Sequence, residues 1–409
     1  MRKPNICAEV RSMKINKTGK NILLAVVLSL MLCGCGSSAE SNSKAEPEQN
    51  TNNTVETVTA ETVSSDDSER FTERDLQQTP DLENAVYYTV SDGENITISE
   101  EGVYVLSGSA EEVTVAVDAA DDAKVQIVLD GVSIKNTSSP VIYVKHADKV
   151  FVTTTDSENI FQVTGSFSSD GDTNTDGVIF SKDDLVLNGG GTLTISSSEN
   201  GVVCKDDLKI TGGTYYVTAS SKAFEANDSI LINDGTFSIT AGTDGFHSEN
   251  DEDDTKGELV ILGGTFNISA KDDALHGQSI VTIEGGTLEI EAGEGIESTQ
   301  VTISDGTINI TAADDGINAG QKSKAYDPVI TISGGNLTIE MAAGDTDAID
   351  SNGDLYISGG SINITAQSPF DYDGKGEYTG GTIVVNGETV TSLTNQMMGG
   401  FAGQNRKRG

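Results

Sequence analysis

The segment KDDALHG, which begins at Lys271, places two adjacent aspartates close to a histidine. Carboxylates beside an imidazole can carry out acid–base chemistry or hold a metal ion. Tetrads of a related kind recur along the chain, each with an acidic, a small, an apolar and a polar residue in that order. The first position is acidic in five successive tetrads, at Asp244, Asp273, Glu294, Asp315 and Asp347.

Equivalent positions in stacked repeats lie about 4.8 Å apart. Two unit charges at that separation repel by roughly 0.9 kcal/mol in water, and by about 3.5 kcal/mol at an effective dielectric of 20. Calcium is the natural cation for such an oxygen-rich extracellular site. We therefore predict Ca²⁺ ligands among Asp244, Asp272, Asp273, Glu294, Glu297, Asp314, Asp315, Asp347, Asp350 and Asp371. The alternative is that Asp-Gly simply makes a good turn, although this does not explain the doubled acids.

A second candidate metal site is the segment DGDTNTDG, in which oxygen ligands stand at alternate positions, as in the first half of a calcium loop. These ligands are Asp170, Asp172, Asn174 and Asp176. The sixth position is Thr175 instead of glycine and the twelfth is Ser181 instead of glutamate, so the segment is not an EF-hand. The alternative is a flexible acidic loop.

Two repeats carry insertions, SENDEDDTKG after His247 and AGQKSKAYDP after Asn318. Both follow the third strand of their repeat, so we expect them on one edge of the fold, where they could wall a groove. Predicted carbohydrate contacts are Lys322, Lys324 and Tyr326 of the second insertion, together with Lys271 and His276. Variable surface loops are the alternative. The three histidines, His146, His247 and His276, are expected first as outward-facing polar residues.

The element that must position these residues is a repeat such as LVILGGTFNISA, present in eight copies with a weaker ninth. Each copy has two alternating strands around a glycine turn, followed by a polar corner and a third short strand. The alternatives are a β-sandwich or a propeller, but repeats of about 22 residues are too short for propeller blades, which need about 40–50 residues. The sequence therefore predicts an all-β fold, a parallel β-helix (solenoid) with three short strands per rung, over residues 85–395.

The ends of the chain are expected to lie outside this fold. Residues 1–34 read as a signal peptide with a lipobox, LCGC, and Met13 is a possible start. Lipidation of Cys35 would anchor the chain to a bacterial membrane as an extracellular, cell-surface lipoprotein; plain signal cleavage is the alternative. Residues 35–84 are predicted as a disordered tether and 396–409 as a disordered, Gly-rich basic tail.

The composition excludes several classes of partner and site. A formal net charge of −39 argues against nucleic acid and anionic membrane as partners of the main body. Of the four cysteines, only Cys204 lies in the predicted fold, which excludes a disulfide or a cysteine zinc cluster there. We expect a monomer.

Three segments carry a resemblance to a known family: KVQIVLDGVSIKNTSSPVIYVKHADKVFVTTTDSEN at 124–159, VIFSKDDLVLNGGGTLTI at 178–195, and the DLKITGGTYYVTA rung that follows. Over about residues 85–393 the chain resembles the secreted clostridial-type carbohydrate-binding domain-containing β-helix proteins. The resemblance implies a right-handed parallel β-helix related to pectate lyases. It also implies calcium at acidic corners and binding of cellulose or polygalacturonate.

The predicted function is therefore non-catalytic binding of a plant-type polysaccharide, either an acidic pectin-like glycan or cellulose, with structural or bridging calcium. The main alternative is a calcium-dependent pectate lyase with a lysine base, for which Lys271 is the best candidate. Related lyases use an arginine or lysine beside calcium, and no arginine occurs between Asp75 and Asn405. A surface adhesin or structural spacer is the third possibility.

Overall fold

The structure, a computed structural model, describes residues 70–343 and 346–395. The chain divides into two units, Met1–Val63 and Ser64–Gly409, and all described elements belong to the second. The predicted signal peptide, Cys35 and the tail at 396–409 lie outside the described residues. No helix among the residues that the structure describes is long and apolar enough to cross a membrane.

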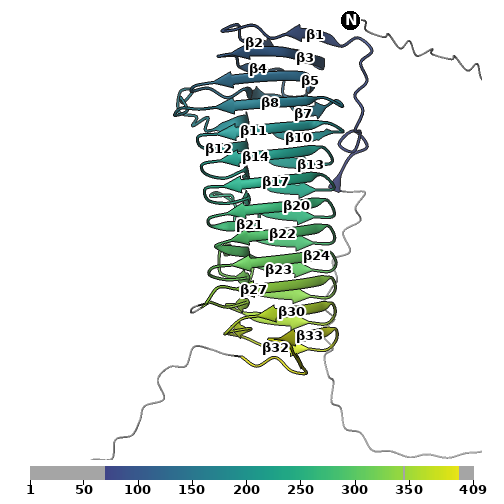
Figure 1. Cartoon of the computed structure of the whole chain (residues 1–409). Coiled ribbons are helices and arrows are strands. Elements are labelled where there is room, and N and C mark those ends of the chain that lie inside the picture. The colour runs from purple at the N-terminus through teal and green to yellow at the C-terminus, as the bar shows by residue number, and fades with distance from the viewer. Residues whose placement is uncertain (1–69, 344–345, 396–409) are drawn as a thin grey trace, which may run out of the picture. The chain divides into compact units, whose positions relative to one another are not determined.

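The described residues form 34 strands, which stack in three columns of paired strands (Figure 1). We name these columns the first, second and third sheet. The first sheet contains β1 (Val86–Thr89), the start of β3 (Gly102–Glu111), the start of β5 (Lys124–Asn136), β7 (Lys149–Thr154), β10 (Asp184–Gly189), β13 (Asp207–Ile210), β16 (Ser229–Ile232), β19 (Glu258–Ile261), the end of β21 (Asp273–Ile283), the end of β23 (Glu294–Ile303), β26 (Val329–Ile332), β29 (Asp354–Ile357) and β32 (Gly376–Tyr378).

The second sheet continues from the ends of β3 and β5 into β8 (Glu158–Val163), β11 (Thr192–Ser197), β14 (Thr214–Ala219), β17 (Thr236–Ala241), β20 (Thr265–Ala270), β22 (Thr287–Ala292), β24 (Thr307–Ala312), β27 (Asn336–Met341), β30 (Ser361–Thr365) and β33 (Thr382–Val385), and ends with the antiparallel β34 (Glu388–Val390). The third sheet contains β2 (Ile96–Ile98), β4 (Val115–Asp118), β6 (Ile142–His146), β9 (Gly177–Ser181), β12 (Asn200–Cys204), β15 (Phe224–Ala226), β18 (Phe246–Ser248), the starts of β21 and β23, β25 (Ile317–Ala319), β28 (Ile349–Ser351) and β31 (Asp371–Tyr372).

The predicted all-β, mainly parallel architecture is confirmed by this pairing. The right-handed winding and the rung length of about 22 residues stay predictions.

Alternation along each second-sheet strand separates the core from the surface. In β17, Phe237 and Ile239 point inward and are buried, whereas the alternate residues Thr236, Ser238 and Thr240 are exposed. The strand register puts Phe237 beside Phe266, and their rings stack with centroids 4.7 Å apart. The same inward position therefore forms a continuous apolar column, which stabilises each rung against the next.

The glycine pairs are required by backbone conformation. Gly264 has φ of +105°, and a Cβ there would lie 2.9 Å from the carbonyl oxygen of Gly235 in the preceding rung. Only glycine fits without strain where φ is positive and the neighbouring backbone is this close. The glycine at position 264 is therefore required for the turn before β20 to pack against the preceding rung.

A short segment before the first strand packs against the first sheet. We call residues 70–79 the strap. Phe71 packs in a small apolar cluster with Leu231 and Val260, and Asp75 is fully buried. The predicted tether included these residues, but a few anchoring side chains fix them to the stack. An average composition over residues 35–84 does not reveal such isolated anchors.

Candidate functional site

A ladder of polar side chains runs along the corner where each second-sheet strand leads into the third sheet. Its corner column holds the first residue of each tetrad: Lys222, Asp244, Asp273, Glu294, Asp315 and Asp347. Its strand column holds the fourth residue, and the strand register places these in succession: Glu225, His247, His276, Glu297, Asn318, Asp350 and Asp371. We call the two columns the polar ladder. The predicted stacking of equivalent tetrad positions is confirmed by this register.

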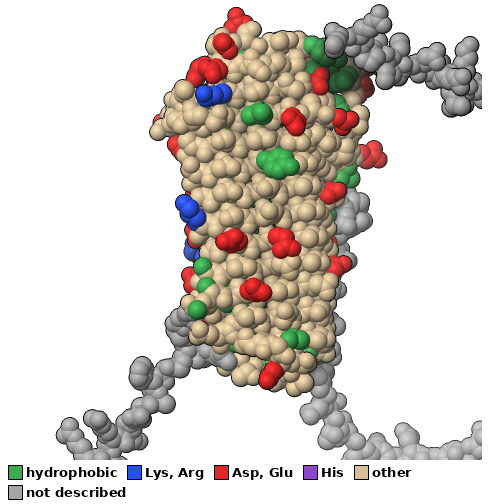
Figure 2. Space-filling model, in the orientation of Figure 1, with side chains coloured by type: hydrophobic (Ala, Val, Ile, Leu, Met, Phe, Trp, Pro, Cys, Tyr) green, Lys and Arg blue, Asp and Glu red, His purple; other side chains and the backbone are tan. Residues whose placement is uncertain are grey.

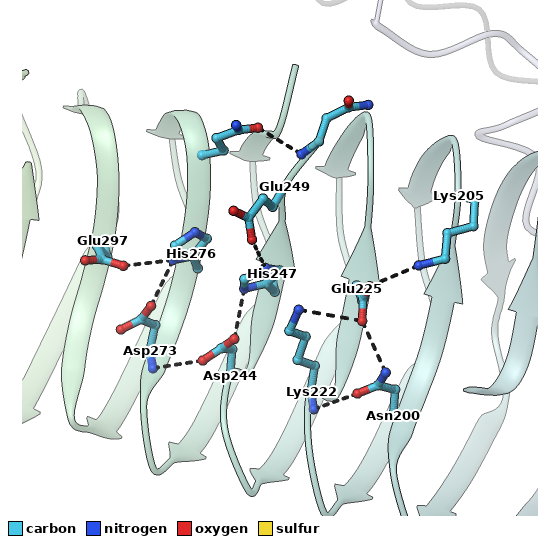
Figure 3. Close-up of polar contacts among 12 residues, drawn as sticks. Asn200, Lys205, Lys222, Glu225, Asp244, His247, Glu249, Asp273, His276 and Glu297 are labelled. Carbon is cyan, nitrogen blue, oxygen red and sulfur yellow. Dashed lines mark hydrogen bonds and ion pairs between the residues drawn. The ribbon is translucent and has the colours of Figure 1, made fainter. Parts of the chain in front are cut away.

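Two histidines occupy successive rungs of the strand column and stack face to face (Figure 3). Their ring centroids are 4.4 Å apart and their planes differ by 13°. Phe246 and Leu275 point into the apolar core, so the histidines that follow them face outward, as expected. They are nevertheless covered, since His247 and His276 are only 7% and 8% exposed. His146, in contrast, is an exposed residue outside the ladder.

Each stacked histidine is held by a carboxylate of its own rung. His247 Nδ1 lies 2.8 Å from Asp244 Oδ2, and His276 Nδ1 lies 2.9 Å from Asp273 Oδ2. Glu297 of the next rung also reaches His276 Nδ1, at 2.9 Å. Acids and imidazoles therefore alternate in space, and the histidines offset much of the repulsion between neighbouring carboxylates.

The two insertions explain why this part of the ladder is buried. Each insertion leaves the third sheet directly after a ladder strand and returns over the ladder. Glu249 of the first contacts His247 Nε2 at 3.0 Å, and Lys322 of the second forms an ion pair with Glu297. The insertions also meet each other, since the Ser323 hydroxyl donates to the Asp254 carbonyl. Their predicted placement on one edge is consistent with these contacts.

Burial and neighbouring charges shift the pKa values of His276 and Glu297 in opposite directions. Burial lowers the pKa of His276, but hydrogen bonds to Asp273 and Glu297 outweigh it and raise that pKa to about 9. Burial raises the pKa of Glu297, but His276 and Lys322 outweigh it and lower the pKa to about 2. Burial dominates at Asp273 and raises its pKa to about 6. The centre of the ladder thus pairs an imidazolium with an ionised Glu297.

The following rungs of the ladder are rich in acids, and we call these residues the acid segment: Glu294, Asp315, Asp347, Asp350 and Asp371. Burial, followed by repulsion from neighbouring acids, raises the pKa of Glu294 to about 8 and that of Asp350 to about 7. Burial likewise raises the pKa of Asp315 to about 6. Asn318 adds a buried Oδ1 that accepts no hydrogen bond from any described residue. Carboxylates and an amide oxygen are the ligand types that Ca²⁺ prefers, although these acids, like those of the loop at 170–176, are not among the described residues that gather three possible ligands within 4.8 Å.

The doubled acids that favoured calcium in the sequence do not all reach the ladder. Asp272 and Asp314 are exposed, while their neighbours Asp273 and Asp315 turn inward. Alternation along the chain makes this outcome expected, since adjacent residues point to opposite sides.

The predicted loop site at 170–176 is divided between separate contacts. Asp170 accepts hydrogen bonds from Lys145 and Tyr143, at 2.9 and 3.1 Å, and Lys145 foremost lowers its pKa. Asn174 donates to Asp176 at 2.7 Å. Asp172 is exposed. Three groups of described residues bring three possible metal ligands within 4.8 Å of one another, and none of these groups contains an acid of this loop.

The predicted carbohydrate contacts are scattered. Lys271 is exposed, and Lys324 lies 3.7 Å from Asp254. Lys322 and His276 are engaged in the ladder, and Tyr326 is half-buried. These five residues therefore do not form one surface.

A regular polar platform on the second sheet was not predicted from the sequence. The outward side chains of the second sheet from β11 to β30 are mostly threonine, serine and asparagine. Figure 2 shows only scattered charged and hydrophobic side chains on the face in view. One column is threonine in six successive rungs: Thr192, Thr214, Thr236, Thr265, Thr287 and Thr307. The column beside it contains Tyr216, Ser238, Asn267, Glu289 and Asn309. The sequence signal for this platform was the run of polar residues at the outward positions of repeats such as TFSITA.

The chain was compared with known proteins. The family model described as carbohydrate-binding domain-containing protein matches residues 92–301 and 295–396. A carbohydrate-binding domain-containing protein from Acetivibrio thermocellus is 33% identical over 120 residues, which cover 28% of this chain and 42% of that protein. The chain thus matches less than half the length of this curated relative.

A solved structure, that of the polysaccharide lyase-like protein from C. thermocellum as a gadolinium derivative, aligns with 73% of this chain and 96% of its own. The sequence identity is 23% and the TM-score is 0.34. Since the family model covers well over half of the sequence, the chain belongs to the family of carbohydrate-binding domain-containing proteins.

Proposed function

We propose that this protein binds a neutral, cellulose-like polysaccharide without cleaving it, along the outward face of the second sheet. The observation that carries the proposal is the register of that face, in which hydroxyl and amide groups repeat from strand to strand at about 4.8 Å. Tyr216 is 50% exposed within it and offers an aromatic ring to a sugar face. Asn309 donates to Glu289 at 2.6 Å, which fixes two polar groups for contact with sugar hydroxyls.

The charge of the face distinguishes between the two glycan classes predicted from the sequence. Glu289, Glu291 and Glu340 are its charged residues from β11 to β30. Carboxylates accept hydrogen bonds from neutral sugar hydroxyls but repel uronates. A pectin-like glycan would therefore need calcium to bridge the two sets of carboxylates.

We also propose that calcium binds in the acid segment, with Asn318 Oδ1 and the carboxylates of Glu294, Asp315 and Asp350 as ligands. Burial first, and then repulsion between neighbouring acids, raises the pKa values of these carboxylates, and a bound divalent cation would favour their ionised forms. Its role in the proposal is to stabilise the stack, and it takes no part in a reaction.

Retention on insoluble cellulose tests the glycan proposal. We expect Tyr216→Ala to weaken retention about fivefold, because an aromatic contact is worth roughly 1 kcal/mol. Tyr87→Ala is the matched control, since Tyr87 is 65% exposed on β1, away from this face. Equal retention of both variants and the unchanged chain would overturn the proposed face. Retention on polygalacturonate alone, dependent on calcium, would favour the acidic glycan.

The absence of cleavage needs its own measurement. Incubation with polygalacturonate and calcium is expected to yield no ultraviolet-absorbing unsaturated product. If product appears and is lost in Lys271→Ala, the runner-up function, a lyase with a lysine base, replaces binding.

Anchoring at the cell surface is the last part of the proposal, and it depends on Cys35. Labelled fatty acid fed to a bacterium that expresses the full chain should be incorporated into the protein, but not into Cys35→Ala. Secretion of the unchanged chain without label would point to plain signal cleavage.

A further inference from the structure

We propose that His247, Glu249 and His276 form a binding site for a zinc-class transition-metal ion, separate from the oxygen-ligated acid segment. One ligand atom from each of these residues lies within 4.8 Å of the other two. The site goes beyond the proposed function, since glycan contact at the second sheet does not require it.

The two imidazoles are arranged in the manner of metal ligands. They come from strands paired in register, β18 and β21, and their near-parallel rings point in a common direction from adjacent rungs (Figure 3). His247 Nε2 is already 3.0 Å from Glu249 Oε2. Zinc lies about 2.1 Å from nitrogen and oxygen ligands, so two ligand atoms of a tetrahedral site are about 3.4 Å apart. The separation of 3.0 Å between His247 and Glu249 is close to that value. A small rotation of His276 would complete the set.

The carboxylates beneath the rings set the tautomer that metal binding needs. Nδ1 of His247 lies 2.8 Å from Asp244, while Nδ1 of His276 is hydrogen-bonded to Asp273 and lies 2.9 Å from Glu297. An imidazole that donates its Nδ1 proton to a carboxylate presents the lone pair of Nε2 to a metal, and such partners commonly support metal-binding histidines. The buried acids thus orient both ligands, and Glu249, with a side chain 46% exposed, supplies the third from the open side.

The ligand set selects the class of metal. Calcium prefers oxygen ligands only, whereas imidazole suits zinc, copper and nickel. Three protein ligands with one side open also leave a coordination position for water or for an oxygen of a bound molecule. Because His276 must lose a proton from Nε2 to bind metal, binding is expected to release protons and to weaken at low pH. The charged groups that face the pair are Asp244, Asp273, Glu225, Glu249, Glu297, Lys222 and Lys322.

Calorimetric titration of the chelator-treated full chain with zinc alone tests the site. We expect one zinc ion per chain, not displaced by a large excess of calcium. Glu249→Gln should weaken binding about tenfold or more and His276→Gln should abolish it. His146→Gln is the matched control, because His146 is exposed and outside the ladder, and should bind zinc unchanged. Titration with Co²⁺ should give a visible absorption band that zinc then removes.

Several outcomes would overturn the site. The proposed site is overturned if the unchanged chain does not bind zinc. It is also overturned if Glu249→Gln and His247→Gln bind zinc as tightly as the unchanged chain. Loss of binding in Asp206→Asn would move the metal to the group of Asp184, Asp206 and Asp207, which also lie close together. Glu249→Gln changes an exposed side chain, so unaltered melting in the absence of metal separates a ligand effect from misfolding. Cellulose retention is measured apart from these titrations, so failure of one proposal leaves the other standing.

Discussion

At the scale of single residues, the ladder shows how a strongly acidic chain keeps carboxylates buried. Asp273 and Glu297 are both less than a tenth exposed, and each contacts the same imidazole nitrogen. The sequence revealed the acids and their spacing, but it did not reveal that two histidines would lie between them. Their burial depends on insertions that return over the strand from outside the repeat, and no local pattern encodes such a return.

The first prediction concerns the pH dependence that His276 contributes in metal-free solution. Its folded pKa of about 9 lies above the unfolded value of about 6.5. The stabilisation is therefore complete below about pH 6.5 and is lost as the pH rises through about 9. We expect the urea midpoint of the unchanged chain to fall between pH 6.5 and 9.5 more steeply than that of His276→Gln. Parallel slopes for the two proteins would contradict this.

The second prediction concerns Asp350, whose pKa of about 7 reflects burial and repulsion from Asp315, Asp347 and Asp371. In chelator at pH 8, Asp350→Asn should raise the free energy of unfolding by about 1 kcal/mol, since it removes a charge that is half-screened by solvent. Added calcium should stabilise the unchanged chain, and stabilise Asp350→Asn much less. Thermal melts with and without calcium measure both effects. Asp272→Asn, at an exposed acid, serves as the control and should alter neither.

At the scale of elements, the strands follow from two features of the sequence. Period-2 alternation predicted which side chains enter the core, and the strand register of β17 with β20 bears this out. The glycine pairs predicted the turns, and Gly264 shows the positive φ that such a turn requires. The platform on the second sheet was missed because its residues are individually unremarkable hydroxyls and amides. Only the register, which aligns them over many rungs, brings them together on one face.

The third prediction belongs to the aromatic column of the core. Phe237 stacks on Phe266 and also contacts Tyr215, Phe224 and Phe246. Phe237→Ala should lower the free energy of unfolding by about 3–5 kcal/mol, because neighbours in a stacked fold cannot close the cavity. Phe237→Leu fills most of that volume and should cost clearly less. Urea unfolding measures the free energy of unfolding of both variants. Equal losses would show that the stability of the aromatic column does not depend on filling the volume of the Phe237 side chain.

At the scale of the whole described unit, the strap connects the N-terminal side of the fold to rungs far along the sequence. Arg70 pairs with Glu284 at 2.9 Å, and Gln78 bonds to the Thr211 carbonyl at 3.0 Å. Asp75 is the central anchor: its carboxylate faces Lys149 and Lys209, and its carbonyl accepts from Thr211. Contacts of such long sequence separation cannot be read from local composition, which explains why the tether was predicted to extend to residue 84.

The last prediction tests whether the strap supports the stack through Asp75. Asp75 is fully buried between Lys149 and Lys209, at 3.6 and 3.8 Å. Asp75→Ala removes the counter-charge of Lys209 and one of the two counter-charges of Lys149, which keeps Asp184 at 3.3 Å. Breaking a buried pair from one side costs about 3 kcal/mol or more. We expect a lower urea midpoint and faster proteolysis within residues 70–79. Glu73→Ala is the control, since Glu73 is exposed on the same segment and should leave both measurements unchanged. A normal midpoint with rapid strap proteolysis would instead show that the three sheets hold together without the strap, and that Asp75 only fixes the segment that contains it.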